Sequence, residues 1–202
     1  MLSLFLKGLL IGFSIAAPVG PIGVLCMRRS LAHGARVGFV TGLGAATADA
    51  MYGCIAAFGL TTLSSFLVGQ RLWLGLVGGA FLCVLGTRTF FSKPADRPAE
   101  TRDRALAAAY TSTLFLTLTN PMTILSFVAV SAGLGLGGSP SYASAAAMVA
   151  GVFIGSAIWW FLLSGGVALF RSRVHAGWMR VANHLSGAII FAFGVYALVA
   201  RP

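Results

Sequence analysis

Residues 14–23 read SIAAPVGPIG, which places a proline-glycine break, Pro18 to Pro21, inside the first long hydrophobic segment. A second break, Asn120-Pro121, lies inside the fourth such segment, one hundred positions after the first. In lipid, each backbone N–H and C=O that a break frees must find another partner, so broken helices persist where they line a cavity. Paired breaks in repeat-built membrane proteins indicate the substrate site. The breaks therefore predict one cavity, and a cleaved signal peptide is the less favoured interpretation of the first segment.

The composition indicates an integral membrane protein. Of the 202 residues, 58% are hydrophobic and only 9% are charged, with a mean hydropathy of +0.92, whereas globular domains carry about 25% charged residues. A spanning helix needs about 20 apolar residues, and the long runs without Asp, Glu, Lys or Arg accommodate six. The predicted spans cover residues 3–27, 38–62, 72–91, 110–132, 143–169 and 182–200. We expect an all-α fold of six transmembrane helices in which helices 1 and 4 are broken.

A polar stretch at residues 92–105, SKPADRPAETRDRA, separates the first three predicted spans from the last three. Because three is odd, the second half must enter the membrane in the opposite sense to the first, which is the arrangement of an inverted repeat. We expect a single membrane domain over residues 1–202. Its predicted parts are repeat 1 at about 1–91, a linker at 92–109 and repeat 2 at about 110–202.

Glycines recur at four-residue spacing in both halves, as Gly38 with Gly42 and as Gly151 with Gly155. Small residues at this spacing let membrane helices approach closely. We interpret these glycines as packing positions in preference to binding positions.

Basic residues concentrate after predicted spans 1, 3 and 5. They are Arg28, Arg29, Arg36, Lys93, Arg97, Arg102, Arg104, Arg171, Arg173 and Arg180. The positive-inside rule places these segments, predicted as loops, in the cytoplasm and both termini outside. The formal net charge of +10 then indicates contact with anionic lipid. Nucleic-acid binding is not expected, because it would need the basic residues on one folded surface with readout elements.

Asp49 is the one acidic residue inside a predicted span. A charge at mid-membrane costs about 2.5–3.5 kcal/mol on insertion scales, so this carboxyl needs a partner, water or a proton. Together with Gly42, Ala45 and Tyr52 it falls on one helical face of small residues that carries a carboxyl and a phenol. We expect Asp49 and Tyr52 to face the cavity and to bind protons or a cationic substrate group. The alternative is a protonated Asp49 that hydrogen-bonds a neighbouring helix for structure alone.

Predicted span 5 carries Trp159 and Trp160 between Gly155 and Gly165. Tryptophan is common at membrane interfaces, but these two lie deep in the span. We expect at least one of them to form a wall of the cavity.

The breaks also suggest how an anionic group would bind. A half-helix can begin after Pro21 and another after Pro121, and a helix N-terminus presents unpaired N–H groups that attract carboxylate. Asn120 adds an amide that donates and accepts, and Thr117, Thr119 and Thr123 add hydroxyls nearby. Pro18, Gly20, Pro21, Asn120 and Pro121 are therefore candidate site residues, the alternative being simple proline kinks.

The chain resembles the LysE/RhtB superfamily of amino-acid exporters through three ordered motifs. These are APVGP at residues 17–21, GLGAATADAMYG at 42–53 around Asp49, and TNP at 119–121. The resemblance spans essentially the whole chain. It implies a bacterial inner-membrane secondary transporter that exports amino acids or related metabolites, is driven by protons and forms a homodimer. Many members of the amino-acid branch have Lys after the Asn-Pro pair, whereas this chain has Met122.

Other functions fit the residues less well. Export of a metal cation or a toxic organic compound through Asp49 is the main alternative. A thiol oxidoreductase would need a cysteine pair, whereas Cys26, Cys54 and Cys83 are scattered over three spans. No cofactor and no resident metal is expected, because His33, His175 and His184 lie at loops or at a span edge, away from any other ligand inside a span. Enzymatic activity is not expected, since the chain offers no combined nucleophile, base and acid.

Overall fold

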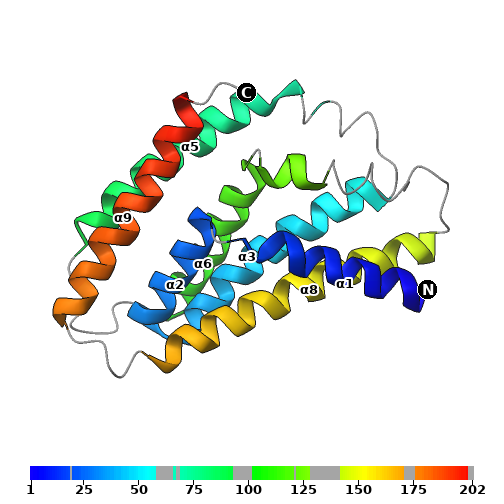
Figure 1. Cartoon of the computed structure of the whole chain (residues 1–202), viewed down its shortest axis with the longest axis horizontal. Helices are drawn as coiled ribbons and strands as arrows, with labels where there is room; N and C mark the ends of the chain where they lie inside the picture. The colour runs from blue at the N-terminus through cyan, green and yellow to red at the C-terminus, as the bar shows by residue number, and fades with distance from the viewer. Residues whose placement is uncertain are drawn as a thin grey trace.

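The computed structural model describes residues 1–18, 20–57, 66, 69–92, 102–120, 122–127, 142–170 and 176–199. Over these residues the chain is helical and contains no strand. The helices, in chain order, are α1 (Leu2–Ala16), α2 (Pro21–His33), α3 (Ala35–Ala57), α5 (Arg71–Phe90), α6 (Arg102–Leu118), α8 (Tyr142–Leu169) and α9 (Ala176–Val199). Figure 1 shows their arrangement. The all-helical fold predicted from the sequence is confirmed.

Three described helices are long and apolar enough to cross a membrane, over Leu72–Phe90, Tyr142–Leu169 and Met179–Val199. The bent pair Leu2–Ala16 and Pro21–His33 passes the same test when it is counted as one span, which makes four. Helix α3 is built largely from glycine, alanine and threonine in place of large apolar residues, and its central position among α2, α6 and α8 accounts for that composition. The described residues therefore hold three or four candidate spans by length and composition.

Prolines and a glycine close together in sequence produce the first break. Helix α1 ends at Ala16, two residues before Pro18, whose missing N–H and ring disfavour further helix. Gly20 takes an extended conformation (φ −115°, ψ −165°), and Pro21 occupies the first turn of α2, where a missing N–H costs nothing. The two helices consequently meet at 81°.

Glycine contacts set the close approach of α1 to α8, which lie side by side in Figure 1. A Cβ added at Gly8 or Gly12 would collide with backbone carbonyls of α8, and one added at Gly151 or Gly155 would collide with carbonyls of α1. A Cβ added at Gly42 of α3 would collide with the Trp160 side chain of α8. All four glycines predicted to serve packing lie at close helix contacts, since a Cβ at Gly38 would collide with the Ser30 side chain.

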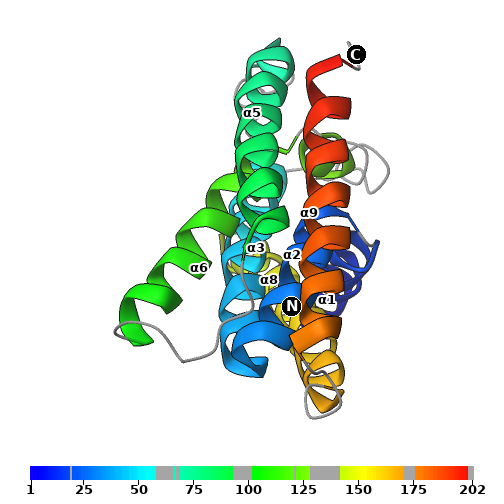
Figure 2. The same cartoon turned by 90° about the vertical axis from the view of Figure 1, so that its left-hand side faces the viewer.

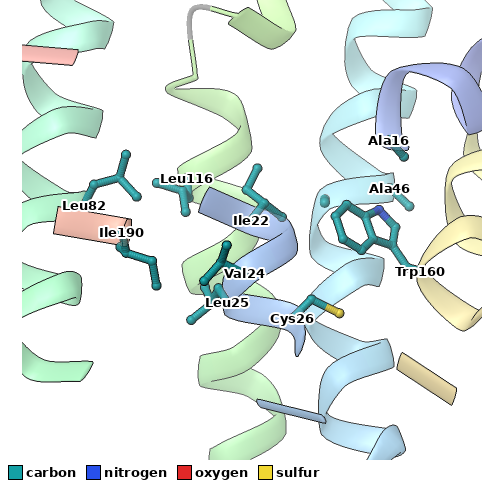
Figure 3. Packing of buried hydrophobic residues seen from close by; sticks show 11 residues of the cluster. Ala16, Ile22, Val24, Leu25, Cys26, Ala46, Leu82, Leu116, Trp160 and Ile190 are labelled. Atoms are coloured by element: carbon teal, nitrogen blue, oxygen red, sulfur yellow. The ribbon is translucent and has the colours of Figure 1, made fainter. Parts of the chain in front are cut away.

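A second pair, α5 and α9, runs side by side in both Figure 1 and Figure 2. Gly79 and Gly86 of α5 meet Gly194 and Gly187 of α9, respectively. Helix α2 connects this pair to the remaining helices, since it contacts α9 as well as α3 and α8. Figure 3 shows Ile22, Val24 and Leu25 of α2 between Leu82 and Ile190 on one side and Ala46 and Trp160 on the other.

The arginines predicted in the first cytoplasmic loop lie instead on helices, which corrects that prediction. Arg28 and Arg29 belong to α2 and Arg36 to α3, with only Gly34 (φ 94°) between the two helices. Arg28 donates from Nε to Asn183 Oδ1 (2.9 Å) and from Nη2 to Ser92 Oγ (2.7 Å). The physical reason is that neutral oxygens of neighbouring helices bind the guanidinium inside the bundle.

Arg29 makes a second such network. Its Nη1 donates to Ala109 O (3.0 Å) and to the hydroxyls of Thr41 and Thr113 (both 3.2 Å), and its Nη2 donates to Ser112 Oγ (3.0 Å). The two arginines therefore tie the C-terminal end of α2 to α3 and α6 through Arg29, and to α9 and the end of α5 through Arg28. The N-terminal end of α2 lies at the first break.

Candidate functional site

A cavity of about 80 Å³ lies where the break between α1 and α2 meets α3, α6 and α8. Its polar lining comes from Asp49, Thr117, Asn120 and Thr123. The break and its flanks contribute Ile15, Ala16, Pro18, Gly20, Pro21, Ile22 and Gly23, and Ala45 and Trp160 complete the wall. Because a water needs roughly 10–15 Å³ of such space, the cavity has room for several waters or for a small solute.

The cavity brings together most of the residues predicted to form a site. Six of them line it, namely Pro18, Gly20, Pro21, Asp49, Asn120 and Trp160. Two others, Tyr52 and Trp159, do not appear in its lining. The ninth, Pro121, lies outside the described residues. The two breaks, one hundred positions apart in sequence, thus meet in one place.

Asp49 is 3% exposed and is held by a chain of hydrogen bonds from α8. Ser156 Oγ donates to Asp49 Oδ2 (2.7 Å), and Trp160 Nε1 donates to Ser156 Oγ (3.1 Å). These two hydrogen bonds hold the Asp49 carboxyl in one orientation. They also fix the Trp160 ring against Gly42.

The N-terminus of α2 opens on the same cavity. Gly20 is its N-cap and supplies no side-chain hydrogen bond, and the first backbone bond at this end runs from Val24 N–H to Gly20 O. The N–H groups of Ile22 and Gly23 precede that bond, and both residues line the cavity. Uncapped N–H groups with the positive end of the helix dipole form a favourable place for an anion.

The second break is different, because Asn120 caps the helix that follows it. Asn120 Oδ1 accepts from Met122 N–H (3.1 Å), and Asn120 O accepts from the N–H groups of Thr123 (3.1 Å) and Ile124 (3.3 Å). Residues 122–127 are helical. One lone pair of Asn120 Oδ1 is therefore used by the helix cap, while the Nδ2 donors remain for the cavity that Asn120 lines.

We expect Asn120→Ser to retain the stability that Asn120→Ala loses. Serine caps helices nearly as well as asparagine, and replacing a cap with alanine costs typically about 1 kcal/mol. The apparent unfolding temperature of the purified protein in detergent measures this difference. Equal unfolding temperatures for the two variants would show that the cap contributes little.

Tyr52 contacts residues on both sides of the second break. Its hydroxyl donates to Leu118 O (2.6 Å) at the C-terminal end of α6, and its ring lies 5.8 Å from that of Phe127. Trp159 packs edge-on against Phe13 of α1, with ring centroids 5.4 Å apart. Both side chains thus hold elements that border the cavity, and neither lines it.

Sequence reasoning missed Ser156 as the partner of Asp49. The available signal was its position four residues before Trp160, which places the two on one face of α8, but no sequence pattern paired that face with Asp49. Thr123 was noted only as a nearby hydroxyl. It is 9% exposed, lines the cavity and makes no side-chain hydrogen bond within the described part of the chain.

The alternative chemistries find little support at this site. Among the described residues, no three His, Cys, Asp or Glu side chains gather as metal ligands do. The three cysteines are free thiols. Cys26 Sγ contacts Gly38 O (3.3 Å), and Cys83 packs beside Gly194 of α9, so these two serve different helix contacts.

Comparison with known proteins gives a consistent family assignment. The family model described as LysE type translocator matches residues 13–201. The chain is 26% identical over 200 residues to a Bacillus subtilis protein named "Putative amino acid efflux protein YcgF", covering 96% of this chain and 95% of that one. It is 33% identical over 176 residues to "Uncharacterized membrane protein YahN" of Escherichia coli, covering 85% and 77%. It is 28% identical over 203 residues to "Chemotactic transduction protein ChpE" of Pseudomonas aeruginosa, covering 98% of each. No solved structure matches.

Proposed function

The chain belongs to the LysE type translocator family, and from this premise we propose that it exports amino acids or closely related metabolites across the bacterial inner membrane, coupled to proton entry. The amino acid efflux named for the Bacillus subtilis relative supports the substrate class. Translocators of this family are transporters, and the proposal includes no catalytic step.

The observation that carries the proposal is a buried carboxyl at the meeting point of two helix breaks. Among the described residues that line the cavity, Asp49 is the only charged one, and the others offer neutral polar groups and apolar surface. Intramembrane carboxyls that face a cavity are typical of proton relays and of sites for cationic substrate groups. Half-helix N-termini near mid-membrane are typical of transporter sites for anionic groups.

The proposed arrangement is six spans in two inverted repeats, with broken helices 1 and 4. Contacts between the two halves support this arrangement because they are reciprocal. Helix α1 of the first half packs along α8 of the second, and α6 of the second half packs along α3 of the first. Equivalent helices also pair across the halves, as α5 does with α9. The proposal also places both termini outside the cytoplasm, has the basic residues contact anionic lipid, and takes the protein to be a homodimer.

A metal cation or toxic organic cation as substrate is less well supported. Ca²⁺ takes about six to eight oxygen ligands, and a soft cation such as Cd²⁺ prefers thiolates. The lining residues that the structure describes carry one carboxyl, that of Asp49, and no cysteine. One carboxylate is enough for a monovalent ammonium group.

Export is tested by loading membrane vesicles that contain the protein with radiolabelled amino acids and imposing an inward proton gradient. We expect efflux of at least one amino acid several-fold above that of vesicles lacking the protein. In vesicles loaded with Cd²⁺ we expect Cd²⁺ efflux no faster than in vesicles lacking the protein. A metabolite survey of a deletion strain against its parent identifies the solute without prior choice. Cd²⁺ efflux without amino-acid efflux would favour the cation alternative.

A further inference from the structure

We propose that the cavity holds an α-amino acid with a small uncharged side chain in one orientation, its carboxylate at the N-terminus of α2 and its ammonium group on Asp49. The amino acid and a proton then compete for one carboxylate. The inference rests on the proposed function, since it takes the cavity to be the transport site.

The position of the substrate carboxylate follows from a difference between the two helix breaks. Both N-termini lie near the cavity, but Asn120 Oδ1 already accepts the Met122 N–H. Within the described residues no side-chain cap hydrogen bond is made at the N-terminus of α2, whose N-cap is Gly20. An incoming carboxylate can therefore bind the Ile22 and Gly23 N–H groups of α2 without displacing a cap.

The position of the ammonium group follows from the second oxygen of Asp49. Ser156 occupies Oδ2, whereas Oδ1 has no hydrogen-bond partner among the described residues. Every fully buried side-chain nitrogen or oxygen in the described residues has a partner, so Oδ1 must open on the cavity that Asp49 lines. An ammonium group placed there gains a charge-assisted hydrogen bond.

No other charged side chain lies among the lining residues that the structure describes. The residues contributed by α1, α2, α6 and α8 are uncharged. On α3 itself, Tyr52 is the titratable side chain nearest to Asp49, and its hydroxyl is donated to Leu118 O. The Thr123 hydroxyl, which makes no side-chain hydrogen bond to the described residues, and Asn120 Nδ2 add neutral polar contacts.

The size and polarity of the wall limit the substrate side chain. The cavity measures about 80 Å³ and is otherwise lined by apolar groups such as Ala16, Ala45 and Trp160. A charged side chain would find no counter-charge there, and burying an unpaired charge is costly. The matching class is therefore small neutral amino acids.

Competition at one carboxylate produces exchange. From the cytoplasm, the ammonium group displaces the proton from Asp49, and from the outside a proton takes the place of the ammonium group. Each cycle moves one neutral zwitterion out and one proton in, so one positive charge enters per amino acid.

The test uses the purified full-length protein in proteoliposomes, with glycine, L-alanine, L-serine, L-threonine, L-leucine and L-arginine as probes. We expect exchange of the small neutral probes against protons, with one charge moved per molecule. The half-saturating concentration should rise by up to about tenfold for each unit by which pH falls on the substrate side. L-lactate and ethylamine, which lack the ammonium group or the carboxylate, should compete at least about tenfold more weakly than L-alanine.

A paired substitution tests the carboxylate position. A Cβ at Gly20 meets nothing within 4 Å, so Gly20→Ser fits and supplies the missing cap to α2, while Gly20→Ala adds the same Cβ without the oxygen. We expect the serine variant to bind the probe at least about fivefold more weakly than the alanine variant, at equal or higher unfolding temperature. Equal affinity of the two would overturn the orientation.

The outcomes separate the two proposals. Amino-acid transport that is electroneutral, or whose affinity is independent of pH, would overturn the shared carboxylate and leave amino-acid export standing. Absence of transport for all six probes and for the solutes of the metabolite survey would overturn both.

Discussion

Asp49→Asn is expected to reduce proton-driven export to the background of vesicles without the protein, while the variant still inserts and folds. Asparagine has nearly the same shape, and Ser156 can still donate to its side-chain oxygen, now in place of Asp49 Oδ2. It can neither take up a proton nor offset a cationic group, and an intramembrane carboxyl that faces a cavity is used for one of these purposes. The measurement is efflux of radiolabelled substrate from vesicles under an inward proton gradient.

Two companion variants make this result interpretable. Asp49→Glu keeps the carboxyl but lengthens it within a close-packed site, so we expect partial export. Ser156→Ala keeps the carboxyl and removes its donor, so we expect reduced export with coupling retained. Export by Asp49→Asn at the level of the unsubstituted protein would assign Asp49 a purely structural role.

Gly155→Val is expected to prevent stable folding. A Cβ at Gly155 collides with the backbone carbonyl of Leu9 on α1, and backbone cannot rotate away as a side-chain end can. Overpacking of a closely fitted interface costs typically 1–3 kcal/mol and occasionally more. Since α1 carries one edge of the break, its displacement should also deform the cavity. The yield of monodisperse protein and its apparent unfolding temperature in detergent measure the effect.

Gly166→Val is the matched control on the same helix. A Cβ at Gly166 meets nothing within 4 Å, and the residue is exposed, so the added side chain faces outward. Helix propensity changes equally in the two variants, which leaves packing as the difference between them. A loss of folded protein that is equal in both would contradict the proposed close approach of α1 and α8.

Much of the candidate site could be predicted because it depends on local chemistry. Proline and glycine at Pro18 to Pro21 end one helix and begin the next in any context, so the position of the first break was predicted correctly. The carboxyl of Asp49 lies alone in an apolar segment, and a charge there costs so much free energy that a cavity was expected beside it. Trp160 and Asn120 were also placed at this cavity, as expected.

Other features could not be predicted, since they depend on which helices meet. The hydrogen bond from Ser156 to Asp49 joins residues 107 positions apart through the packing of α3 on α8. Arg28 and Arg29 were predicted in a loop because arginine is costly in lipid, whereas neutral oxygens on α3, α6 and α9 bind them within the bundle. The cap made by Asn120 is local, but its amide could equally have turned toward a substrate.

The amino-acid sequence by itself determined that the chain is a helical membrane protein, where its first helix breaks and which carboxyl is isolated in an apolar segment. These properties follow from residue chemistry and from the cost of unpaired polar groups in lipid. Only the tertiary structure decided that the two breaks share one cavity and that Ser156 holds one oxygen of Asp49. The physical reason is that these relations depend on helix packing set by glycines distant in sequence.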